Sequence, residues 1–338
     1  MNLGIVGVTG VVGTEMLNCL ENLNIEINKL KLFSSKKNIG NKIVFKKKEY
    51  ILDEINEDSF YNLNYVLFAV NSNLSKIFYT YAKKHKCIVI DNSSAFRLKK
   101  DYPLIIPEIN SNLLRENEYD LISNPNCSTI LLNLTLYKIY KIFGLKRIVV
   151  STYQAASGAG IEGLKELENQ CIEFSKEKKV KSKNIFKKQY IWNVFSHNSD
   201  VNLINGYNEE ELKIINETKK IFNNDKINIT ATCVRVPVFR AHCESINITL
   251  EKSATEEEIR NLLINTEGIK IMDDRINNNF PEPILTSNKY DIYVGRIRPD
   301  LSQEKNKGYE LFISGDQILK GAALNAVQIL NVLSKMKK

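Results

Sequence analysis

The stretch LGIVGVTGVVG at residues 3–13 decides the fold of this chain. It begins with an apolar run rich in β-branched residues, which predicts a buried strand, and a helix is expected from about residue 14. Between them, Gly7, Gly10 and Gly13 form G-x-x-G-x-x-G. Missing side chains at such a turn let backbone N–H groups approach a pyrophosphate at a helix N-terminus. The segment therefore predicts a βαβ opening that binds a dinucleotide, although an ordinary tight turn could carry the same glycines.

Apolar strands continue to alternate with amphipathic helices through the first 127 residues. Further strands are predicted at 29–33, 65–70, 87–91 and 120–123, with a helix at 73–85. This alternation is typical of the α/β class and predicts a Rossmann-like doubly wound parallel sheet.

The pattern changes after Cys127. A helix to about Phe143 is followed by several extended runs, at 147–154, 229–236, 244–251, 284–286, 291–298 and 309–314. They predict a second α+β domain with a mainly antiparallel sheet, which carries catalytic groups and a subunit contact. We expect an NADP-binding domain at 1–127, completed by a C-terminal helix at 318–338, and a catalytic and dimerisation domain at 128–317.

The composition is that of a soluble globular protein. Of the 338 residues 43% are apolar and 25% charged, and the formal net charge is 47 − 39 = +8. Seven lysines fall in residues 176–188, but no aromatic residues interleave at stacking spacing, so a solvated surface segment is favoured over a nucleic-acid site. No apolar run is long enough to cross a membrane and no leader pattern is evident, so we expect a cytoplasmic protein with no membrane partner.

Six cysteines suggest neither a disulfide framework nor a metal site. They lie at 19, 87, 127, 171, 233 and 243, without paired spacing or clustering with the three histidines. Cys127 differs from the others because it follows Asn124-Pro125-Asn126, where a strand turn gives way to a helix. A helix N-terminus there favours the thiolate, so Cys127 is the candidate nucleophile.

The end of the second strand bears on the choice of dinucleotide. Phe33 is followed by Ser34, Ser35, Lys36 and Lys37, where an NAD-specific enzyme would place an acid for the ribose hydroxyl. Hydroxyls and lysines suit a 2′-phosphate, so NADP is favoured, although these lysines could simply solvate a loop. The predicted cofactor contacts in this part of the chain are Gly7, Thr9, Gly10, Val11, Val12, Gly13, Ser35, Lys37 and Asn38.

The hexapeptide NPNCST at 124–129 resembles the active-site segment of aspartate-semialdehyde dehydrogenases. The resemblance extends in order through TGVVG at 9–13, DNSSAFR at 91–97, TYQAASGAG at 152–160, NGYNEEELKIINETKK at 205–220, CVRVP at 233–237, HCES at 242–245 and GDQILKGAALNAVQ at 315–328. It is closest to the shorter bacterial branch of the family.

The resemblance implies an NADP-dependent, reversible reductive dephosphorylation of 4-aspartyl phosphate to aspartate 4-semialdehyde. This reaction serves lysine (through diaminopimelate), threonine and methionine biosynthesis. Cys127 would form a thioester that NADPH reduces, with His242 as the acid/base group and Gln154 orienting the substrate. His85 and His197 lack such a context and are expected to be surface residues.

The same resemblance implies a substrate site. Arg235 would bind the α-carboxylate through a bidentate fork, and Glu210 would meet the amino group. Lys213, Arg97 and Asn126 would bind phosphate. Taken without the resemblance, Glu210 and Lys213 are an i, i+3 surface ion pair. Ser157, Gly158 and Gln317 are implied to contact the cofactor.

Two positions depart from the family pattern. Lys37 stands where arginine is common, which removes a bidentate contact to the 2′-phosphate. Cys243 stands where serine is usual and places a second thiol near the expected site, either as a harmless small residue or as a thiol able to form an unwanted disulfide with Cys127 under oxidation.

Two rival functions remain open from the sequence. An N-acetyl-glutamyl-phosphate reductase would share the architecture, but its blocked amine would leave Glu210 without a cation. A catalytically silent NADP-binding protein would not need Cys127, Gln154, Arg235 and His242 together. The partners expected are the small-molecule substrate and phosphate, no nucleic acid, and a second copy of the chain in a homodimer or a dimer of dimers.

Overall fold

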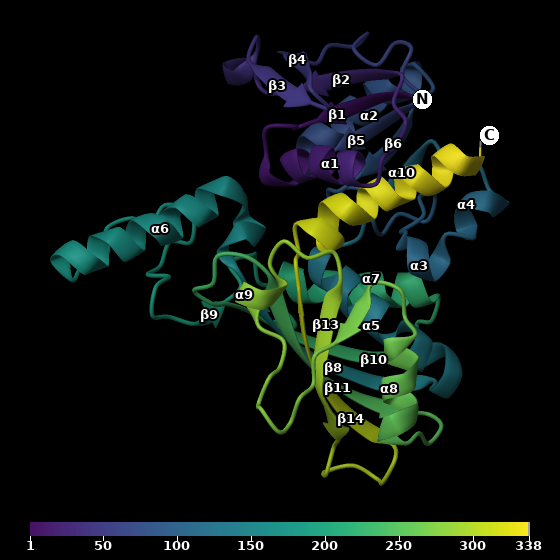
Figure 1. Cartoon of the computed structure of the whole chain (residues 1–338), viewed down its shortest axis with the longest axis vertical. Helices are drawn as coiled ribbons and strands as arrows, with labels where there is room; N and C mark the ends of the chain where they lie inside the picture. The colour runs from purple at the N-terminus through teal and green to yellow at the C-terminus, as the bar shows by residue number, and fades with distance from the viewer. Residues whose placement is uncertain (337–338) are drawn as a thin grey trace. The chain divides into compact units, whose positions relative to one another are not determined.

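The computed structural model describes residues 1–336 and divides into two compact units (Figure 1). The first comprises Met1–Asn126 together with the chain from Ala322 onward, and the second comprises Cys127–Gly321. Lys337 and Lys338, which the predicted C-terminal helix 318–338 includes, lie outside the described residues.

The first unit is built on a doubly wound sheet with strand order β3-β4-β2-β1-β5-β6-β7. Only the pairing of β3 with β4 is antiparallel. The strands are β1 (Asn2–Val6), β2 (Lys29–Phe33), β3 (Lys42–Phe45), β4 (Lys48–Asp53), β5 (Tyr65–Phe68), β6 (Ile88–Asp91) and β7 (Leu121–Ser123). The chain moves outward from β1 in both directions, so the end of β1 is the switch point at which such sheets bind ligands. The predicted α/β class is confirmed.

Helices pack on this sheet from both ends of the chain. They are α1 (Val11–Asn22), α2 (Ser72–Lys84), α3 (Pro107–Asn110), α4 (Leu113–Glu116) and α10 (Leu324–Met336), with the short 3₁₀ helix η1 (Lys36–Asn38). The C-terminal α10 packs against α1 and α3 (Figure 1). The Asn325 side chain fixes its start by donating to the Ile105 carbonyl over 3.0 Å and to Asn124 Oδ1 over 2.7 Å.

Two local features differ from the sequence expectation. The β3–β4 hairpin was not predicted, because its turn is formed by Lys46 and Lys47 at φ 48° and 63°, without the Asn-Gly signal usual there. Residues 284–286, expected to be extended, instead belong to α9 (Pro283–Thr286). Pro283 occupies the first helical position, which its fixed φ favours.

The second unit holds a mixed sheet with strand order β12-β13-β14-β11-β8-β10-β9. The β8–β10 and β12–β13 pairs are parallel, and the other pairs are antiparallel. The sheet is therefore mainly antiparallel, as predicted. The strands are β8 (Leu145–Gln154), β9 (Phe195–Ser196), β10 (Asn228–Arg235), β11 (His242–Leu250), β12 (Ile269–Ile271), β13 (Ile292–Pro299) and β14 (Gly308–Gly315).

One face of this second sheet is covered by helices. They are α5 (Cys127–Phe143), α7 (Glu209–Phe222) and α8 (Glu256–Ile264), and α5 packs between the other two. Along β8, Ile148, Val150 and Thr152 are buried beneath them, whereas Arg147 and Tyr153 on the opposite face are exposed. The period-two alternation of side chains on a strand produces this division.

The lysine-rich segment forms the end of α6 (Gly160–Glu177) and the irregular chain that follows it. All seven lysines between Lys176 and Lys188 are exposed, as expected for a solvated segment. Phe186 and Tyr190 are buried against Leu167 of α6 and hold the segment in place. Among residues 1–336, no helix combines the length and apolar character that a membrane crossing requires.

Glu244 of β11 is buried on the covered face of the second sheet. Within residues 1–336, neither of its carboxylate oxygens has a hydrogen-bond partner. Burial therefore raises the pKa of Glu244 well above its usual value, since the charged form would be poorly solvated.

We expect Glu244→Gln to weaken the loss of stability at alkaline pH. Because the folded-state pKa of Glu244 is raised, its contribution to stability is complete below the unfolded pKa and is lost as pH rises through the folded pKa. Glutamine does not titrate, so the variant's melting temperature should exceed the wild-type value by about 2 °C or more at pH 8, with less difference near pH 5. Calorimetry at both pH values measures this. The exposed Glu168→Gln serves as the control, and equal pH dependence in all three proteins would contradict the expectation.

Candidate active site

Three predicted site residues meet at one edge of the second sheet because of its strand directions. Gln154 ends β8 and Arg235 ends the parallel strand β10, and the two residues pair in register. β11 runs antiparallel to β8, so its first residue, His242, lies at the same edge, with Cys243 paired to Tyr153. All three side chains are buried.

His242 is fixed by a backbone group. The Ala155 N–H donates to His242 Nδ1 over 3.0 Å, which leaves the hydrogen of the neutral ring on Nε2. Nε2 is buried and has no partner in the described chain. Burial and the neighbouring positive charge of Arg235 lower the pKa of His242 to about 3. At neutral pH this side chain is therefore an uncharged imidazole with a donor available at Nε2.

Arg235 is held from two sides. Its Nε donates to Asn198 Oδ1 over 3.1 Å and its Nη1 donates to the Ala155 carbonyl over 3.0 Å. The guanidinium carbon lies 5.8 Å from the centre of the Phe186 ring. Burial lowers the pKa of Arg235 from its high usual value, which an arginine can tolerate without losing its charge. The hydrogen bonds to the described residues use Nε and Nη1, so Nη2 can bind an anion.

Cys127 is the first residue of α5, a helix of 17 residues, and its side chain is partly exposed. The partial positive charge of the helix N-terminus favours a thiolate there. The π-helical turn η3 (Leu319–Ala323) runs against this residue: a Cβ at Gly321 would lie 2.8 Å from Cys127 Cβ and 3.2 Å from its Cα. Glycine at 321 therefore permits the close approach.

The other thiols differ from Cys127 in burial. Cys19, Cys87, Cys233 and Cys243 are buried, and burial raises the pKa of Cys87 and of Cys243 to about 11. The expectation that Cys243 lies beside the site is wrong. Successive residues of a strand face opposite sides of the sheet, so Cys243 points away from the face that carries His242. Within residues 1–336, no cluster of three or more His, Cys, Asp or Glu side chains could hold a metal ion.

Gln154 and Glu210 form a buried polar cluster. Gln154 Nε2 donates to Ser128 Oγ over 3.2 Å and to Glu210 Oε1 over 3.3 Å. Lys213 Nζ lies 3.5 Å from Glu210 Oε2, across one turn of α7. The predicted i, i+3 pair is present, but Glu210 is only 6% exposed, so it is not a surface pair.

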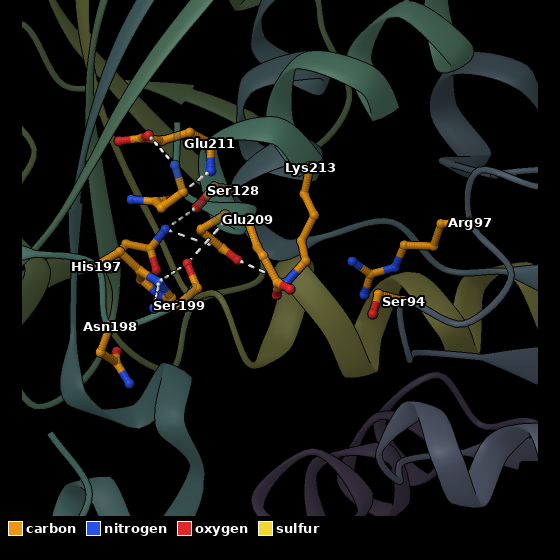
Figure 2. Close-up of polar contacts among 12 residues, drawn as sticks. Ser94, Arg97, Ser128, His197, Asn198, Ser199, Glu209, Glu211 and Lys213 are labelled. Atoms are coloured by element: carbon orange, nitrogen blue, oxygen red, sulfur yellow. Dashed lines mark hydrogen bonds and ion pairs between the residues drawn. The ribbon is translucent and has the colours of Figure 1, made fainter. Parts of the chain in front are cut away.

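His197 is also part of this region, which sequence reasoning missed. It is half-buried beside Ser199, whose N–H donates to His197 Nδ1 over 3.2 Å (Figure 2). Burial, with Arg235 as the second cause, lowers the pKa of His197 to about 4. The surface position expected for it is wrong, because β9 pairs with Val234 and Arg235 and brings the following loop against the site. No local pattern in the sequence signals this long-range pairing.

Gly158 leaves space above His242 and Arg235. A Cβ at this position would lie 2.9 Å from Arg235 Nη1 and 3.2 Å from His242 Nε2. Beside it, Ser157 Oγ accepts a hydrogen bond from Gln317 Nε2, and Gln317 Oε1 accepts from the Ala241 N–H over 3.0 Å. Ser157, Gly158 and Gln317 therefore lie in the same part of the second unit as His242.

In the first unit, the glycine-rich turn has the close packing expected of a phosphate-binding turn. Gly7 adopts φ 80°, and a Cβ there would lie 2.4 Å from the Ala69 carbonyl oxygen. A Cβ on Gly13 would lie 2.3 Å from the Gly7 carbonyl oxygen, so α1 approaches β1 only without that side chain. Gly10, the N-cap of α1, provides no capping side chain, so the amides of Val11 and Val12 are suited to receive a phosphate.

The end of β2 adds a polar cluster to this turn. Thr9 Oγ1 lies 2.8 Å from Ser34 Oγ, and Asn38 Nδ2 donates to both hydroxyls. Ser35 and Lys37 are exposed, and among the described residues no acidic side chain pairs with Lys37. Lys36, by contrast, lies 3.5 Å from Glu54. The cluster therefore offers hydroxyls, an amide and one uncommitted ammonium group.

Two predicted phosphate ligands also belong to the first unit. Arg97 is 8% exposed, and its Nη2 donates to the Asn92 carbonyl over 2.6 Å. The loop that carries it is anchored by Asp91, which accepts hydrogen bonds from Ser75 and Ser93. Asn126 is buried as well and ends the first stretch of this unit.

Both units match known protein families. Residues 2–117 match the family described as semialdehyde dehydrogenase, NAD binding domain, and residues 136–320 match the semialdehyde dehydrogenase, dimerisation domain. Together these matches span most of the chain.

Relatives that match nearly the whole chain identify the family more specifically. A protein from Prochlorococcus marinus named aspartate-semialdehyde dehydrogenase is 41% identical over 333 residues, covering 98% of this chain and 96% of the relative. The protein of the same name from Bacillus subtilis is 40% identical, covering 99% of this chain and 98% of the relative.

Solved structures agree with these relatives. The aspartate semialdehyde dehydrogenase II of Vibrio cholerae, described as complexed with ASA, is 34% identical, with a TM-score of 0.93 over 99% of this chain and 98% of that chain. A Candida albicans enzyme described with NADP shares the fold, at 18% identity, a TM-score of 0.74 and 98% of each chain. This chain belongs to the aspartate-semialdehyde dehydrogenase family of oxidoreductases.

Proposed function

We propose that this protein catalyses the NADP-dependent, reversible reductive dephosphorylation of 4-aspartyl phosphate to aspartate 4-semialdehyde through a thioester on Cys127. The observation that carries the proposal is the single sheet edge at which Arg235, Gln154 and His242 meet, with Glu210 hydrogen-bonded to Gln154. A fixed cation and a buried carboxylate are the groups that a free amino acid needs for recognition.

Cys127 performs the covalent chemistry in this proposal. Its thiolate attacks the acyl carbon of the substrate, the C–O bond to phosphate breaks, and phosphate leaves with the electron pair. The thioester carbon would then be open to reduction, for which NADPH, when bound, would supply the hydride. The oxyanion then collapses, the C–S bond breaks, and the aldehyde leaves as Cys127 regains its thiolate. The reverse sequence begins with thiolate addition to the aldehyde.

His242 stabilises the oxygen that becomes negative. Its Nδ1 accepts from Ala155, so the hydrogen on Nε2 can be donated to an oxyanion. A neutral imidazole with this hydrogen in place is set to donate at Nε2 rather than to accept there. This refines the acid/base role that the family resemblance implies for His242.

The substrate would be bound through its charges. Arg235 binds the α-carboxylate with its remaining donor, Glu210 binds the ammonium group, and Lys213, Arg97 and Asn126 bind phosphate. An acetylated amine has no positive charge and would leave the buried Glu210 carboxylate without a cation, which disfavours an N-acetyl-glutamyl-phosphate reductase.

The cofactor proposal is NADP rather than NAD. Gly7, Gly10 and Gly13 with the amides that open α1 fit a pyrophosphate, and Thr9, Ser35, Lys37 and Asn38 fit a phosphorylated ribose. In the second unit, Ser157, Gly158 and Gln317 would bind the nicotinamide end. The absence of an acid after β2 supports this choice.

We also propose that the protein forms a homodimer in the cytoplasm. The match to a dimerisation domain supports a homodimer, alone or as a dimer of dimers, formed through the second unit. A catalytic thiolate must stay reduced, and the cytoplasm keeps thiols reduced, so we infer a cytoplasmic enzyme.

Cys127→Ala is expected to abolish turnover, because no other group can carry the acyl intermediate. The measurement is phosphate-dependent NADP reduction with aspartate semialdehyde, followed by absorbance and repeated with NAD and with N-acetylglutamate semialdehyde. Cys171→Ser, at the exposed thiol of α6, should retain full activity. In the Cys171→Ser protein, iodoacetamide should label Cys127 before any other thiol. An active Cys127→Ala enzyme, or labelling no faster at Cys127, would contradict the thioester mechanism.

Arg235→Lys should chiefly raise KM for the amino-acid substrate, because lysine cannot reproduce the planar fork that Asn198 and Ala155 hold. KM is expected to rise about tenfold or more, the size typical of a hydrogen bond between charged groups, and kcat should change less. Steady-state kinetics at saturating phosphate and NADP measure the split. Arg115→Lys, at an exposed position, is the control; an unchanged KM in Arg235→Lys would rule out the carboxylate role.

Lys37→Ala should raise KM for NADP and leave KM for NAD nearly unchanged, since only NADP carries the phosphate that this ammonium group would meet. KM for NADP is expected to rise about tenfold, the size typical of one charge-assisted contact. Lys36→Ala is the matched control because Lys36 pairs with Glu54. Equal effects of Lys37→Ala on both cofactors would remove Lys37 from the 2′-phosphate site.

A further inference from the structure

The loop His197–Asn198–Ser199 follows β9 and connects two parts of the substrate site. At its start, the His197 N–H donates to the Cys233 carbonyl over 2.8 Å, two residues before Arg235. β9 itself pairs antiparallel with Val234 and Arg235. The beginning of the loop is therefore tied to the strand that ends in Arg235.

Asn198 orients the Arg235 guanidinium without changing its charge. Its Oδ1 accepts from Arg235 Nε over 3.1 Å, whereas the Ala155 carbonyl accepts from Nη1. A neutral amide oxygen fixes the plane of the fork, whereas a carboxylate at this position would neutralise the cation. Arg235 thus keeps its positive charge for a substrate anion.

Ser199 connects the same loop to Glu210. Its Oγ accepts from the Glu210 N–H over 3.3 Å, in the first turn of α7, where backbone N–H groups lack helical partners. The same hydroxyl lies 3.1 Å from His197 Nδ1, to which it can donate its hydrogen. The adjacent Asp200 carbonyl accepts from the Glu209 N–H over 2.9 Å, so the loop contacts the start of α7 at two points.

We propose that the loop His197–Asn198–Ser199 sets the spacing between Arg235 and Glu210 and thereby selects substrates that carry both a carboxylate and a free ammonium group. This inference rests on the proposed function, because it assigns the two ends of the loop to the two charges of an amino acid. Asn198 and Ser199 are positioning residues: each acts through a side chain or backbone group that another residue presents.

The inference predicts a loss of discrimination rather than a general loss of activity. In Asn198→Ala, the guanidinium loses one of its two fixed contacts, and KM for aspartate semialdehyde should rise about tenfold, the size expected for a hydrogen bond to a charged group. In Ser199→Ala, the Glu210 N–H loses its partner, and the preference for aspartate semialdehyde over succinate semialdehyde, which lacks the amine, should fall severalfold. Ser199→Thr keeps the hydroxyl and should restore the preference.

The experiment compares kcat and KM for both aldehydes in the full-length wild type and the variants. Ser196→Ala is the matched control, since Ser196 is exposed in the adjacent β9. Melting temperatures within a few degrees of the wild type identify variants whose fold is intact. The expected result is a KM-dominated change in Asn198→Ala, a loss of selectivity in Ser199→Ala, and neither in Ser196→Ala or Ser199→Thr.

The two possible failures are distinguishable. A folded wild type without phosphate-dependent activity would contradict the proposed function, and the inference would fall with it. An active wild type with unchanged KM in Asn198→Ala and unchanged selectivity in Ser199→Ala would overturn the inference alone. Equal losses with both aldehydes in Ser199→Ala would also overturn it, because a structural defect would not distinguish the amine.

Discussion

The backbone of Ala155 is the contact on which the candidate active site depends. Its N–H donates to His242 Nδ1 and its carbonyl accepts from Arg235 Nη1, each over 3.0 Å. One peptide segment at the end of β8 thus fixes both the imidazole and the guanidinium. This arrangement follows from the order of the strands, because β8 lies between β10 and β11. Both contacts use backbone atoms of Ala155, which a substitution of its side chain would leave in place.

Burial gives each of these fixed groups its charge state. It lowers the pKa of His242 to about 3, so the imidazole is neutral and donates from Nε2. Arginine keeps its charge when buried, because its ordinary pKa is very high and its donors are hydrogen-bonded. The result is a site with a permanent cation beside a neutral donor, which suits an anionic substrate whose reaction creates an oxyanion.

Glycines determine how closely the remaining parts approach within each unit. In the second unit, Gly321 lets the π-helical turn run against Cys127, and Gly158 keeps the space over His242 and Arg235 open. In the first unit, Gly7 and Gly13 bring the start of α1 against the end of β1. In each case an added Cβ would lie at less than normal van der Waals distance from a neighbouring atom, so a side chain at any of these positions would push the candidate site apart or displace the backbone beside it.

The sequence by itself determined the α/β opening, the glycine turn, the helix that begins at Cys127 and the missing acid after β2. These features are local, since strand and helix periodicity and turn glycines act over a few residues. Arg235, Glu210 and His242 were found through family resemblance, but only the tertiary structure decided that they gather around Gln154 and Ala155. It also decided that His197 joins them and that Cys243 faces away. Those outcomes depend on strand pairing between distant segments and on which side of the sheet is buried, and neither is encoded by neighbouring residues alone.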